Sequence, residues 1–320
     1  MKLKTAVIGI GNMGKNHVRI YSELKESELV AISDINEKLG KELAEKHSCN
    51  YYKNYKDLLK KEKIDAVSIC VPTSLHYQVA ADAINSGINL LIEKPIASSL
   101  AEANKIVELA EKSGVKLTVG HVERFNPAVK RLKEIIDEGR LGTVISLLAR
   151  RVGLFPPQIK DSNVIIDLAV HDIDIFNYII GEQPLSVYAK GGKGLIKSRE
   201  DYAGLFLTYT NNVNAIIEVN WITPVKIRIL NITGTEGYAS LNYITQDLVL
   251  YENNYEKSYD KFGDFVFKFG KPKKQTIRIK KEEPLKLELK DFLLCIKNDK
   301  EPSVSGLDGI NALKIALESL

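Results

Sequence analysis

A glycine-rich turn near the start of the chain constrains its fold more than any other feature. The turn reads Gly9-x-Gly11-x-x-Gly14; an apolar, strand-like run precedes it and a helical pattern follows. A second apolar run then ends at Asp34. Glycines at this spacing between a strand and a helix, with an acid ending the next strand, are typical of a dinucleotide-binding βαβ unit. Glycines that serve only a tight turn are the alternative.

Each glycine has a separate expected role. Gly9 permits the tight turn, Gly11 lets the backbone approach a pyrophosphate, and Gly14 allows close packing of helix on strand. The helix N-terminus at Asn12 and Met13 offers unpaired N–H groups and a positive dipole end to the phosphates. These five residues form the expected phosphate site.

Asp34 predicts which dinucleotide binds, because its carboxylate is placed to accept hydrogen bonds from the adenosine ribose. A carboxylate about 4 Å from a phosphate charge costs on the order of 1 kcal/mol in water and roughly 4 kcal/mol at an effective dielectric of 20. The 2′-phosphate of NADP is therefore disfavoured. The residues that follow, Ile35 to Lys38, include no arginine. NAD is the expected cofactor, and Lys38 is the residue that could permit dual specificity.

Length and composition fit a two-domain globular protein. The chain has 320 residues, 44% of them hydrophobic and 27% charged. Its net charge of +4 is too small to argue for a nucleic-acid partner. Its three cysteines share no spacing typical of a disulfide framework or a zinc site. No signal peptide and no apolar run of about 18 residues is seen, so a cytoplasmic location without membrane contact is expected.

Strand-like and helix-like segments alternate through the first 120 residues. Apolar runs predict buried parallel strands at 5–10, 29–33, 65–71, 88–92 and 115–119. Helical patterns lie between them at about 13–24, 37–47, 55–61, 75–86 and 99–113. The alternation predicts a doubly wound α/β domain over residues 1–120.

The pattern changes after Gly120. Helices are expected near 127–137, 164–180, 284–297 and 307–319. Strands are expected at 143–152, 185–190, 201–209, 213–221, 226–233, 237–241, 246–251 and 275–280. These elements predict an α+β domain over 121–320 with a large, mainly antiparallel sheet. Residues 153–157 read as a Gly/Pro loop, and 251–274, which lack clear periodicity, as a long loop or lid.

The turn at the carboxyl end of the strand at 65–71 is expected to face the cofactor, because ligands bind at that edge of a doubly wound sheet. It contains Val71, Pro72, Thr73 and His76. All four are predicted cofactor contacts. For His76, a structural role at the start of the next helix is the alternative.

The next parallel strand ends at Glu93-Lys94-Pro95. Glu93 and Lys94 are predicted to reach the cofactor pocket. A lysine ammonium that enters such a pocket beside a proline-stiffened turn can polarise a hydroxyl or stabilise an alkoxide. A surface ion pair between Lys94 and Glu93 is the alternative.

The polar side chains of a mostly apolar predicted helix include Asp167, His171, Asp172 and Asp174. Of these, Asp167, His171 and Asp174 are the candidate site residues. Spacings of four and three residues place them on one helix face. A carboxylate beside an imidazole fixes its tautomer and raises its basicity, as a general base requires. A zinc site and a capping or core histidine are the alternatives. No cysteine or second histidine stands out as a further zinc ligand, so no metal is predicted.

These motifs, in this order, resemble the Gfo/Idh/MocA oxidoreductase family, which includes glucose–fructose oxidoreductase and inositol dehydrogenase. The glycine triplet, Glu93-Lys94-Pro95 and the Asp167–Asp174 helix match its pattern over nearly the whole chain. The resemblance implies a Rossmann domain, an open-faced-sheet substrate domain, NAD as cofactor, and homodimers or homotetramers. It also implies that Lys94 and His171 are catalytic and that Asp167 orients the substrate.

Three further stretches, at 120–127, 155–157 and 165–174, are similar to members of that family that oxidise UDP-N-acetylglucosamine at C3. This likeness implies a nucleotide-sugar substrate, a 3-keto product and a sugar aminotransferase as a downstream partner. The expected substrate contacts are Lys94, Arg124, Asn126, Asp167 and His171. Arg124, Arg150 and Arg151 are candidates for the pyrophosphate, because a guanidinium binds phosphate well.

Other functions remain open at this point. Another sugar or polyol, such as inositol or a free hexose, is the alternative substrate. A non-catalytic sensor of NAD and sugar could use the same fold, because a fold alone does not fix function; the presence of Lys94 and His171 argues against it. Reduction of a non-sugar carbonyl or imine is a further alternative.

Overall fold

The computed structural model describes residues 2–155, 162–259, 261–262 and 264–320. The chain divides into two compact units, which are described separately. Unit 1 comprises Met1–Phe125, Ile159–Ser162 and Glu283–Leu317, and unit 2 comprises Asn126–Gln158, Asn163–Glu282 and Glu318–Leu320. The first division lies close to the predicted boundary at residue 120. Residues 283–317, however, belong to unit 1 rather than to the second domain.

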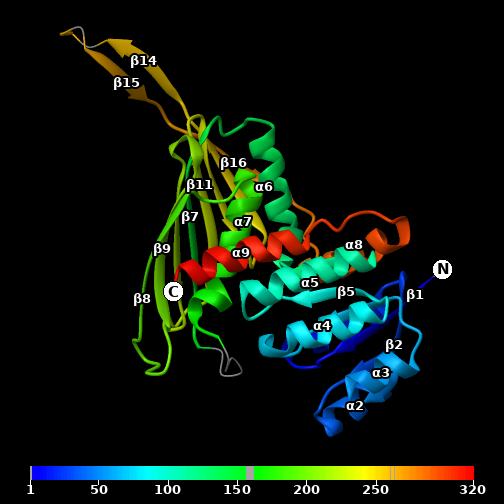
Figure 1. Ribbon diagram of the computed structural model, residues 1–320. Coiled ribbons are helices and arrows are strands. Elements are labelled where there is room, and N and C mark those ends of the chain that lie inside the picture. Colours follow the sequence, from blue (N-terminus) through cyan, green and yellow to red (C-terminus); the bar gives the residue numbers. More distant parts are fainter. Residues whose placement is uncertain (1, 156–161, 260, 263) are drawn as a thin grey trace. The chain divides into compact units, whose positions relative to one another are not determined.

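Unit 1 is built on a six-stranded parallel sheet with the order β3-β2-β1-β4-β5-β6 (Figure 1). Its strands are β1 (Leu3–Ile8), β2 (Ser27–Ser33), β3 (Asn50–Tyr52), β4 (Ala66–Ile69), β5 (Asn89–Glu93) and β6 (Leu117–Gly120). The helices between them are α1 (Asn12–Glu23), α2 (Glu37–His47), α3 (Tyr55–Lys61), α4 (His76–Asn85) and α5 (Leu100–Ser113). The strand order reverses between β1 and β4, as in a Rossmann fold. The short strand β3 was not predicted.

The C-terminal helices α8 (Pro284–Asn298) and α9 (Gly306–Glu318) pack within unit 1. Leu289 and Phe292 of α8 share a buried cluster with Tyr21 of α1. Gly309 of α9 lies so close to Val119 of β6 that an added Cβ would stand 2.8 Å from its side chain. An amphipathic pattern predicts that a helix covers a core but not which core, so this assignment could not be read from the sequence.

Unit 2 contains an eight-stranded sheet with the order β16-β13-β12-β11-β7-β10-β9-β8. Its strands are β7 (Val144–Val152), β8 (Ser186–Gly192), β9 (Tyr202–Thr208), β10 (Asn214–Asn220), β11 (Ile227–Gly234), β12 (Gly237–Asn242), β13 (Asp247–Glu252) and β16 (Lys273–Ile277). The β7–β10 pair is parallel and the other pairs are antiparallel. The helices α6 (Pro127–Asp137) and α7 (Val170–Ile180) cover one face, and the other face is open (Figure 1).

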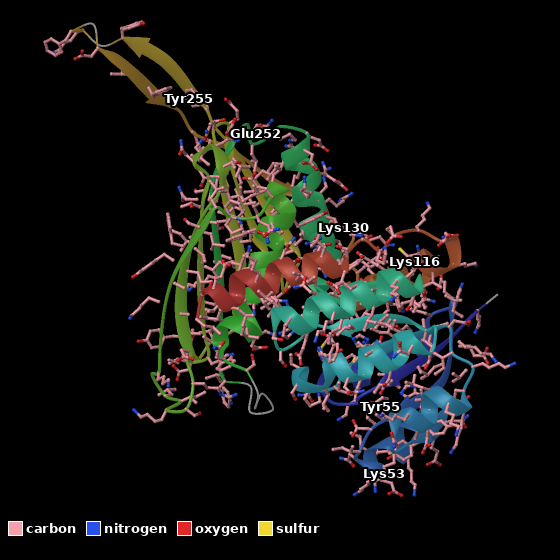
Figure 2. The ribbon with its side chains drawn as sticks, viewed as in Figure 1. Lys53, Tyr55, Lys116, Lys130, Glu252 and Tyr255 are labelled. Atoms are coloured by element: carbon pink, nitrogen blue, oxygen red, sulfur yellow. The ribbon has the colours of Figure 1, made fainter. Side chains whose placement is uncertain are left out.

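A β-hairpin stands where a long loop or lid was expected over 251–274, so that prediction was wrong. Strand β14 (Tyr255–Tyr259) pairs with β15 (Phe265–Phe269), and the hairpin extends away from the large sheet (Figure 1). Glu252 and Tyr255 lie at its base (Figure 2). Tyr259 and Phe267 are 71% and 46% exposed. Residues 251–274 show no regular alternation of apolar and polar residues, so the usual strand signal is weak.

The two units confirm the predicted fold class, a doubly wound α/β domain together with an α+β domain that has a large open-faced sheet. Within the described parts of the chain, no helix is long and apolar enough to cross a membrane.

Candidate active site

The glycine turn joins β1 to α1, and two of its glycines pack against neighbouring backbone. Gly9 has φ +87°, and a Cβ there would lie 2.7 Å from the backbone of Cys70 and Val71. A Cβ on Gly14 would lie 1.9 Å from the carbonyl oxygen of Gly9. At Gly11 an added Cβ would meet no non-neighbouring atom of the described residues within 4 Å. The outer glycines close the turn, and the middle one leaves space for a ligand.

The first turn of α1 suits an anion. Its N-cap is Gly11, so no side chain caps the first backbone N–H groups of this helix. Asn12 and Met13 are exposed. Uncapped N–H groups and the helix dipole together bind phosphate. The predicted phosphate contacts therefore lie around one helix end.

Asp34 lies beside the same turn, directly after β2. One carboxylate oxygen accepts a hydrogen bond from the N–H of Ile10 and the other from the N–H of Asn36, both at 2.8 Å. The side chain is partly exposed, and each carboxylate oxygen can accept more than one hydrogen bond. The backbone thus holds the carboxylate in place while it stays accessible to a ribose hydroxyl.

The turn after β4 leaves Val71, Pro72 and Thr73 at least partly exposed, but His76 is not placed as a cofactor contact. Its ring is buried, with Nδ1 2.9 Å from the carbonyl oxygen of Pro95 and Nε2 3.0 Å from that of Val71. Burial lowers the pKa of His76, and a neutral imidazole donates through one nitrogen at a time. His76 therefore has the structural role, connecting two turns.

Glu93 also points into the protein rather than toward a ligand. Its carboxylate lies 3.0 Å from Nε2 of His17 on α1. Nδ1 of His17 lies 3.0 Å from the hydroxyl of Ser68, which lies 2.8 Å from that of Tyr21. Every group is satisfied when Tyr21 donates to Ser68, Ser68 to His17, and His17 to Glu93. Burial raises the pKa of Glu93, but the hydrogen bond from His17 and the charge of Lys94 hold it below its ordinary value.

Cys70 lies beside this network, and its sulfur is within 4.8 Å of ligand-type atoms of His17 and Glu93. Both nitrogens of His17 already take part in hydrogen bonds. Burial raises the pKa of the Cys70 thiol well above its ordinary value, which disfavours the thiolate that binds metals. The cluster therefore favours a hydrogen-bonded network over a metal centre.

Lys94 lies between two residues that contact buried histidines. Glu93 on one side contacts His17, and the carbonyl of Pro95 on the other side faces His76. Lys94 itself is partly exposed. The backbone turn that carries Lys94 is thus held by contacts with α1 and with the first residue of α4.

Asp167 and His171 belong to unit 2, on a helix that starts with a π-helical turn (η3, Ile165–Ala169) and continues as α7. Such turns within helices are frequent at functional sites. Both side chains are partly exposed, whereas the three residues between them are buried. The two polar groups therefore lie on the accessible side of a mostly buried helix, as their spacing predicts.

Asp172 and Asp174 on the same helix are buried, each 1% exposed. Asp172 accepts two hydrogen bonds from the guanidinium of Arg151 on β7, at 2.7 and 3.0 Å. This bidentate pair anchors α7 on the sheet. Asp174 was expected on the same helix face as His171. Three residues, however, turn a helix by only about 300°, which is less than a full turn. Asp174 therefore lies to one side of His171 around the helix axis, and it is buried.

Arg124 and Asn126, which were predicted to contact substrate, have partners inside their own units. Arg124 is 8% exposed and pairs with Asp308 at 3.0 Å. Asn126 is 1% exposed; its amide oxygen accepts from the N–H of Ala128 and caps α6, and its nitrogen donates to the carbonyl of Tyr243, both at 3.1 Å. These contacts give both residues structural roles.

Arg150 and Arg151 are adjacent on β7 and so face opposite sides of the sheet. Arg151 forms an ion pair with Asp172 on the face that the helices cover. Arg150 forms an ion pair with Glu218, at 2.8 Å, on the open face. Neither is placed as the pyrophosphate ligand that was expected.

In the stretch 155–157, Phe155 packs edge-on against Trp221, with ring centroids 5.3 Å apart. Pro156 and Pro157 lie outside the described residues.

His17 was not predicted as part of the site. It follows Gly14 by three residues, on the face of α1 that also buries Val18 and Tyr21. A histidine on the buried face of a helix requires a polar partner, and this requirement is the signal that could have identified it.

Models of two known domains match the chain. One is described as an oxidoreductase family with an NAD-binding Rossmann fold and matches residues 3–121. The other is the GFO/IDH/MocA C-terminal domain and matches residues 129–240.

Individual proteins match over nearly their full length. UDP-N-acetylglucosamine 3-dehydrogenase of Acidithiobacillus ferrooxidans is 28% identical over 99% of this chain and 96% of its own length. An uncharacterised oxidoreductase of Bacillus subtilis is 30% identical over 98% and 92%, and scyllo-inositol 2-dehydrogenase (NAD⁺) of that bacterium is 28% identical over 99% and 92%. A solved structure of the Acidithiobacillus enzyme matches with a TM-score of 0.87 over 100% of this chain and 97% of the other.

Proposed function

Because the chain belongs to the NAD-binding Gfo/Idh/MocA oxidoreductase family, we propose that it oxidises a secondary alcohol of a sugar. In its most specific form, the proposal is that the C3 hydroxyl of UDP-N-acetylglucosamine becomes a ketone, which gives UDP-2-acetamido-3-dehydro-2-deoxyglucose. Inositol or a free hexose is the second candidate substrate, because one relative of equal identity is a scyllo-inositol 2-dehydrogenase.

Three side chains of this protein would handle the reacting hydroxyl. NAD, when bound, accepts a hydride at C4 of its nicotinamide ring. The imidazole of His171 removes the hydroxyl proton as the carbon loses its hydride. The ammonium of Lys94 holds the oxygen and stabilises the negative charge that develops on it. Asp167 orients the substrate.

The observation that carries this proposal is the partial exposure of Asp167 and His171, on a helix in which the three residues between them are buried. Polar side chains on such a helix are normally turned inward to partners, as Asp172 is toward Arg151. A carboxylate and an imidazole on the accessible side of the helix can also face a ligand. Asp167 and His171 belong to unit 2, whereas Lys94 and the predicted dinucleotide residues belong to unit 1.

The nucleotide sugar is favoured over a free sugar on two grounds. A relative that is similar over nearly the whole of both chains is a UDP-N-acetylglucosamine 3-dehydrogenase. A UDP group also supplies binding energy remote from the reacting carbon, which holds the C3–H bond in position for hydride transfer.

The test uses the chemistry of the ketone, because NAD oxidises alcohols unfavourably near neutral pH and little NADH accumulates. The enzyme is incubated with NAD and UDP-N-acetylglucosamine in deuterated water, and the sugar is analysed by mass spectrometry. A 3-ketone exchanges hydrogen at C2 or C4, and hydroxylamine traps it as an oxime. We expect both products with the intact enzyme and neither with His171→Ala. If neither forms while inositol or a free hexose is turned over well, the nucleotide-sugar assignment is wrong.

The proposed product also defines its consumer. A sugar ketone accepts an amino group from an amine donor, so an aminotransferase acting on the 3-keto nucleotide sugar is the downstream partner that we propose. Such an enzyme, present in the assay, would draw the unfavourable oxidation forward.

We further propose that the chain forms a homodimer or homotetramer through the open face of the eight-stranded sheet. One row of cross-strand neighbours on that face consists of Tyr188, Phe206, Ile216 and Leu148. They are 71%, 41%, 42% and 44% exposed, respectively. Contiguous apolar side chains at this exposure mark an interaction surface.

A further inference from the structure

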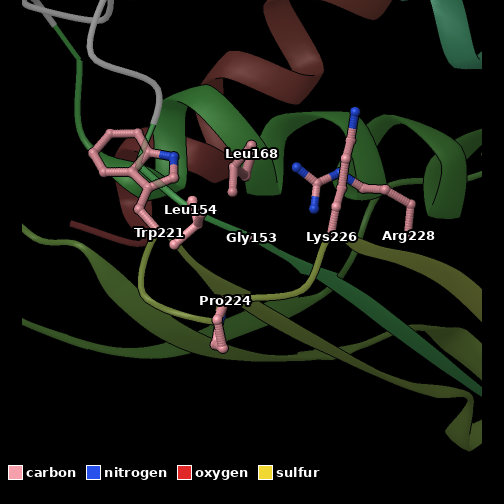
Figure 3. A pocket seen from close by; sticks show the side chains of 7 residues that line it. All are labelled: Gly153, Leu154, Leu168, Trp221, Pro224, Lys226 and Arg228. Carbon is pink, nitrogen blue, oxygen red and sulfur yellow. The ribbon is translucent and has the colours of Figure 1, made fainter.

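A pocket of about 330 Å³ lies in unit 2, beside the helix that carries Asp167 and His171 (Figure 3). Leu168 forms part of its wall. Leu168 directly follows Asp167, and less than one helical turn separates it from His171. The volume is near the lower end of small-molecule sites, enough for part of a nucleotide sugar. The pocket therefore adjoins the residues proposed to act on the reacting hydroxyl.

The polar side chains of this pocket are all hydrogen-bond donors. They are the indole of Trp221, the ammonium of Lys226 and the guanidinium of Arg228. Two of the three are positively charged, and no carboxylate side chain is among the described residues that line the pocket. A sugar hydroxyl both donates and accepts, whereas phosphate oxygens only accept. The lining therefore complements an anionic group that is rich in acceptors.

Arg228 is fixed in a definite orientation. Its Nη1 donates to the carbonyl oxygens of Val152 and Ile227, at 2.6 and 2.9 Å. Arg228 is opposite Arg151 in the β7–β11 register, so it lies on the sheet face that carries α7. Figure 3 shows its guanidinium directed across the pocket toward Leu168. A cation held in this way needs little reorganisation to bind an anion.

Trp221 supplies an independent indication of a ligand. It is 2% exposed, and its Nε1 has no hydrogen-bond acceptor among the described residues. A buried donor without an acceptor is unfavourable, and each such case calls for an explanation. In Figure 3 the indole nitrogen lies on the side of the ring toward Leu168. An acceptor atom of a ligand in the pocket would satisfy it.

We propose that this pocket binds the phosphates of a nucleoside diphosphate sugar. The inference rests on the proposed function, because it places the sugar of the same molecule at Asp167 and His171. In such a substrate, one pyranose ring separates the C3 hydroxyl from the phosphate attached at C1, which suits the short step along the helix from His171 to Leu168. Trp221, Lys226 and Arg228 then take the role that the sequence assigned to Arg124, Arg150 and Arg151.

The experiment uses the intrinsic fluorescence of Trp221, the single tryptophan of the chain. UDP, inorganic pyrophosphate and N-acetylglucosamine are titrated separately into enzyme saturated with NAD, which occupies the dinucleotide site. We expect UDP and pyrophosphate to change the emission and N-acetylglucosamine to leave it unchanged. Lys226→Gln should weaken UDP binding by about tenfold or more, and Lys226→Arg should restore it. Lys271→Gln, which removes an exposed lysine of the same unit, is the matched control.

The outcomes separate this inference from the proposed function. If UDP-N-acetylglucosamine is oxidised but UDP leaves the emission unchanged and Lys226→Gln leaves KM unchanged, the pocket assignment is overturned and the proposed function stands. If UDP binds and Lys226→Gln weakens it but no UDP-sugar is oxidised, the phosphate site stands and the proposed function fails.

Discussion

Nε2 of His17, on the helix after the glycine turn, lies 3.0 Å from the carboxylate of Glu93, the residue before Lys94. His17 is fully buried and Glu93 nearly so. The helix that is suited to phosphate and the turn that carries the lysine are therefore joined by one buried hydrogen bond. A change at this bond should affect both the stability of unit 1 and the position of Lys94.

His17→Ala leaves the buried carboxylate of Glu93 without its partner. Removing one partner of a buried pair costs about 3–5 kcal/mol, so the free energy of unfolding should fall by that order. Urea denaturation followed by circular dichroism measures it. His47→Ala, at a more exposed histidine that contacts Ser22, is the control and should cost less than about 1 kcal/mol. Equal losses in the two variants would contradict the role given to the buried bond.

Glu93 should make stability depend on pH in the acid range. Its pKa in the folded protein lies below the ordinary value of 4.5, so the unfolded chain takes up a proton before the folded one does. The stabilisation is therefore complete above about pH 4.5 and is lost as the pH falls through the folded pKa. Glu93→Gln cannot titrate. The stability difference between wild type and variant should shrink below pH 4.5, and a constant difference in urea titrations from pH 7 to 3.5 would exclude this explanation.

Local patterns predicted the geometry of residues whose placement depends on backbone shape or helix spacing. Gly9 and Gly14 are needed where backbone segments meet, and Asp167 and His171 share the accessible side of one helix. In both cases, sequence spacing fixes the geometry directly.

Local patterns could not predict the partners of residues that pair with side chains distant in sequence. Arg124 is neutralised by Asp308, and Glu93 turns inward to His17. A local pattern shows that a charged side chain follows a strand, but not which way it points. The pocket around Trp221 and Arg228 was missed for the same reason, because the sheet register brings its walls together.

Asp34 should make the enzyme prefer NAD. We expect NADH to bind at least about tenfold more tightly than NADPH, or about 1.4 kcal/mol, because the carboxylate opposes a 2′-phosphate. Fluorescence titration of both reduced cofactors measures the ratio. Asp34→Asn removes the charge and leaves one oxygen to accept from either the N–H of Ile10 or that of Asn36, so it should bring the affinities for NADH and NADPH closer. Equal affinities in the wild type would rule out this role.

His171 and Lys94 should affect the reaction more than cofactor binding. His171→Ala should lower kcat by about 10²–10⁴ and leave NAD affinity nearly unchanged, because His171 is not among the residues predicted to bind the dinucleotide. Lys94→Ala should lose at least as much activity. Single-turnover rates and NADH titrations on the same samples separate the two effects. Near-normal turnover by His171→Ala would assign the base to another group.

Ile216 should be a sensitive position for self-association. It lies in the middle of the apolar row on the open sheet face, between Phe206 and Leu148. A lysine there would bring a charge into the centre of any interface formed by this row, where desolvation is costly. We expect the wild type to sediment as a dimer or tetramer and Ile216→Lys to shift toward the 35.8 kDa single chain. Asn85→Lys adds the same charge to an exposed site in unit 1 and should leave the assembly intact. If Ile216→Lys retains the wild-type mass while its circular dichroism is unchanged, the contact between chains lies on another surface.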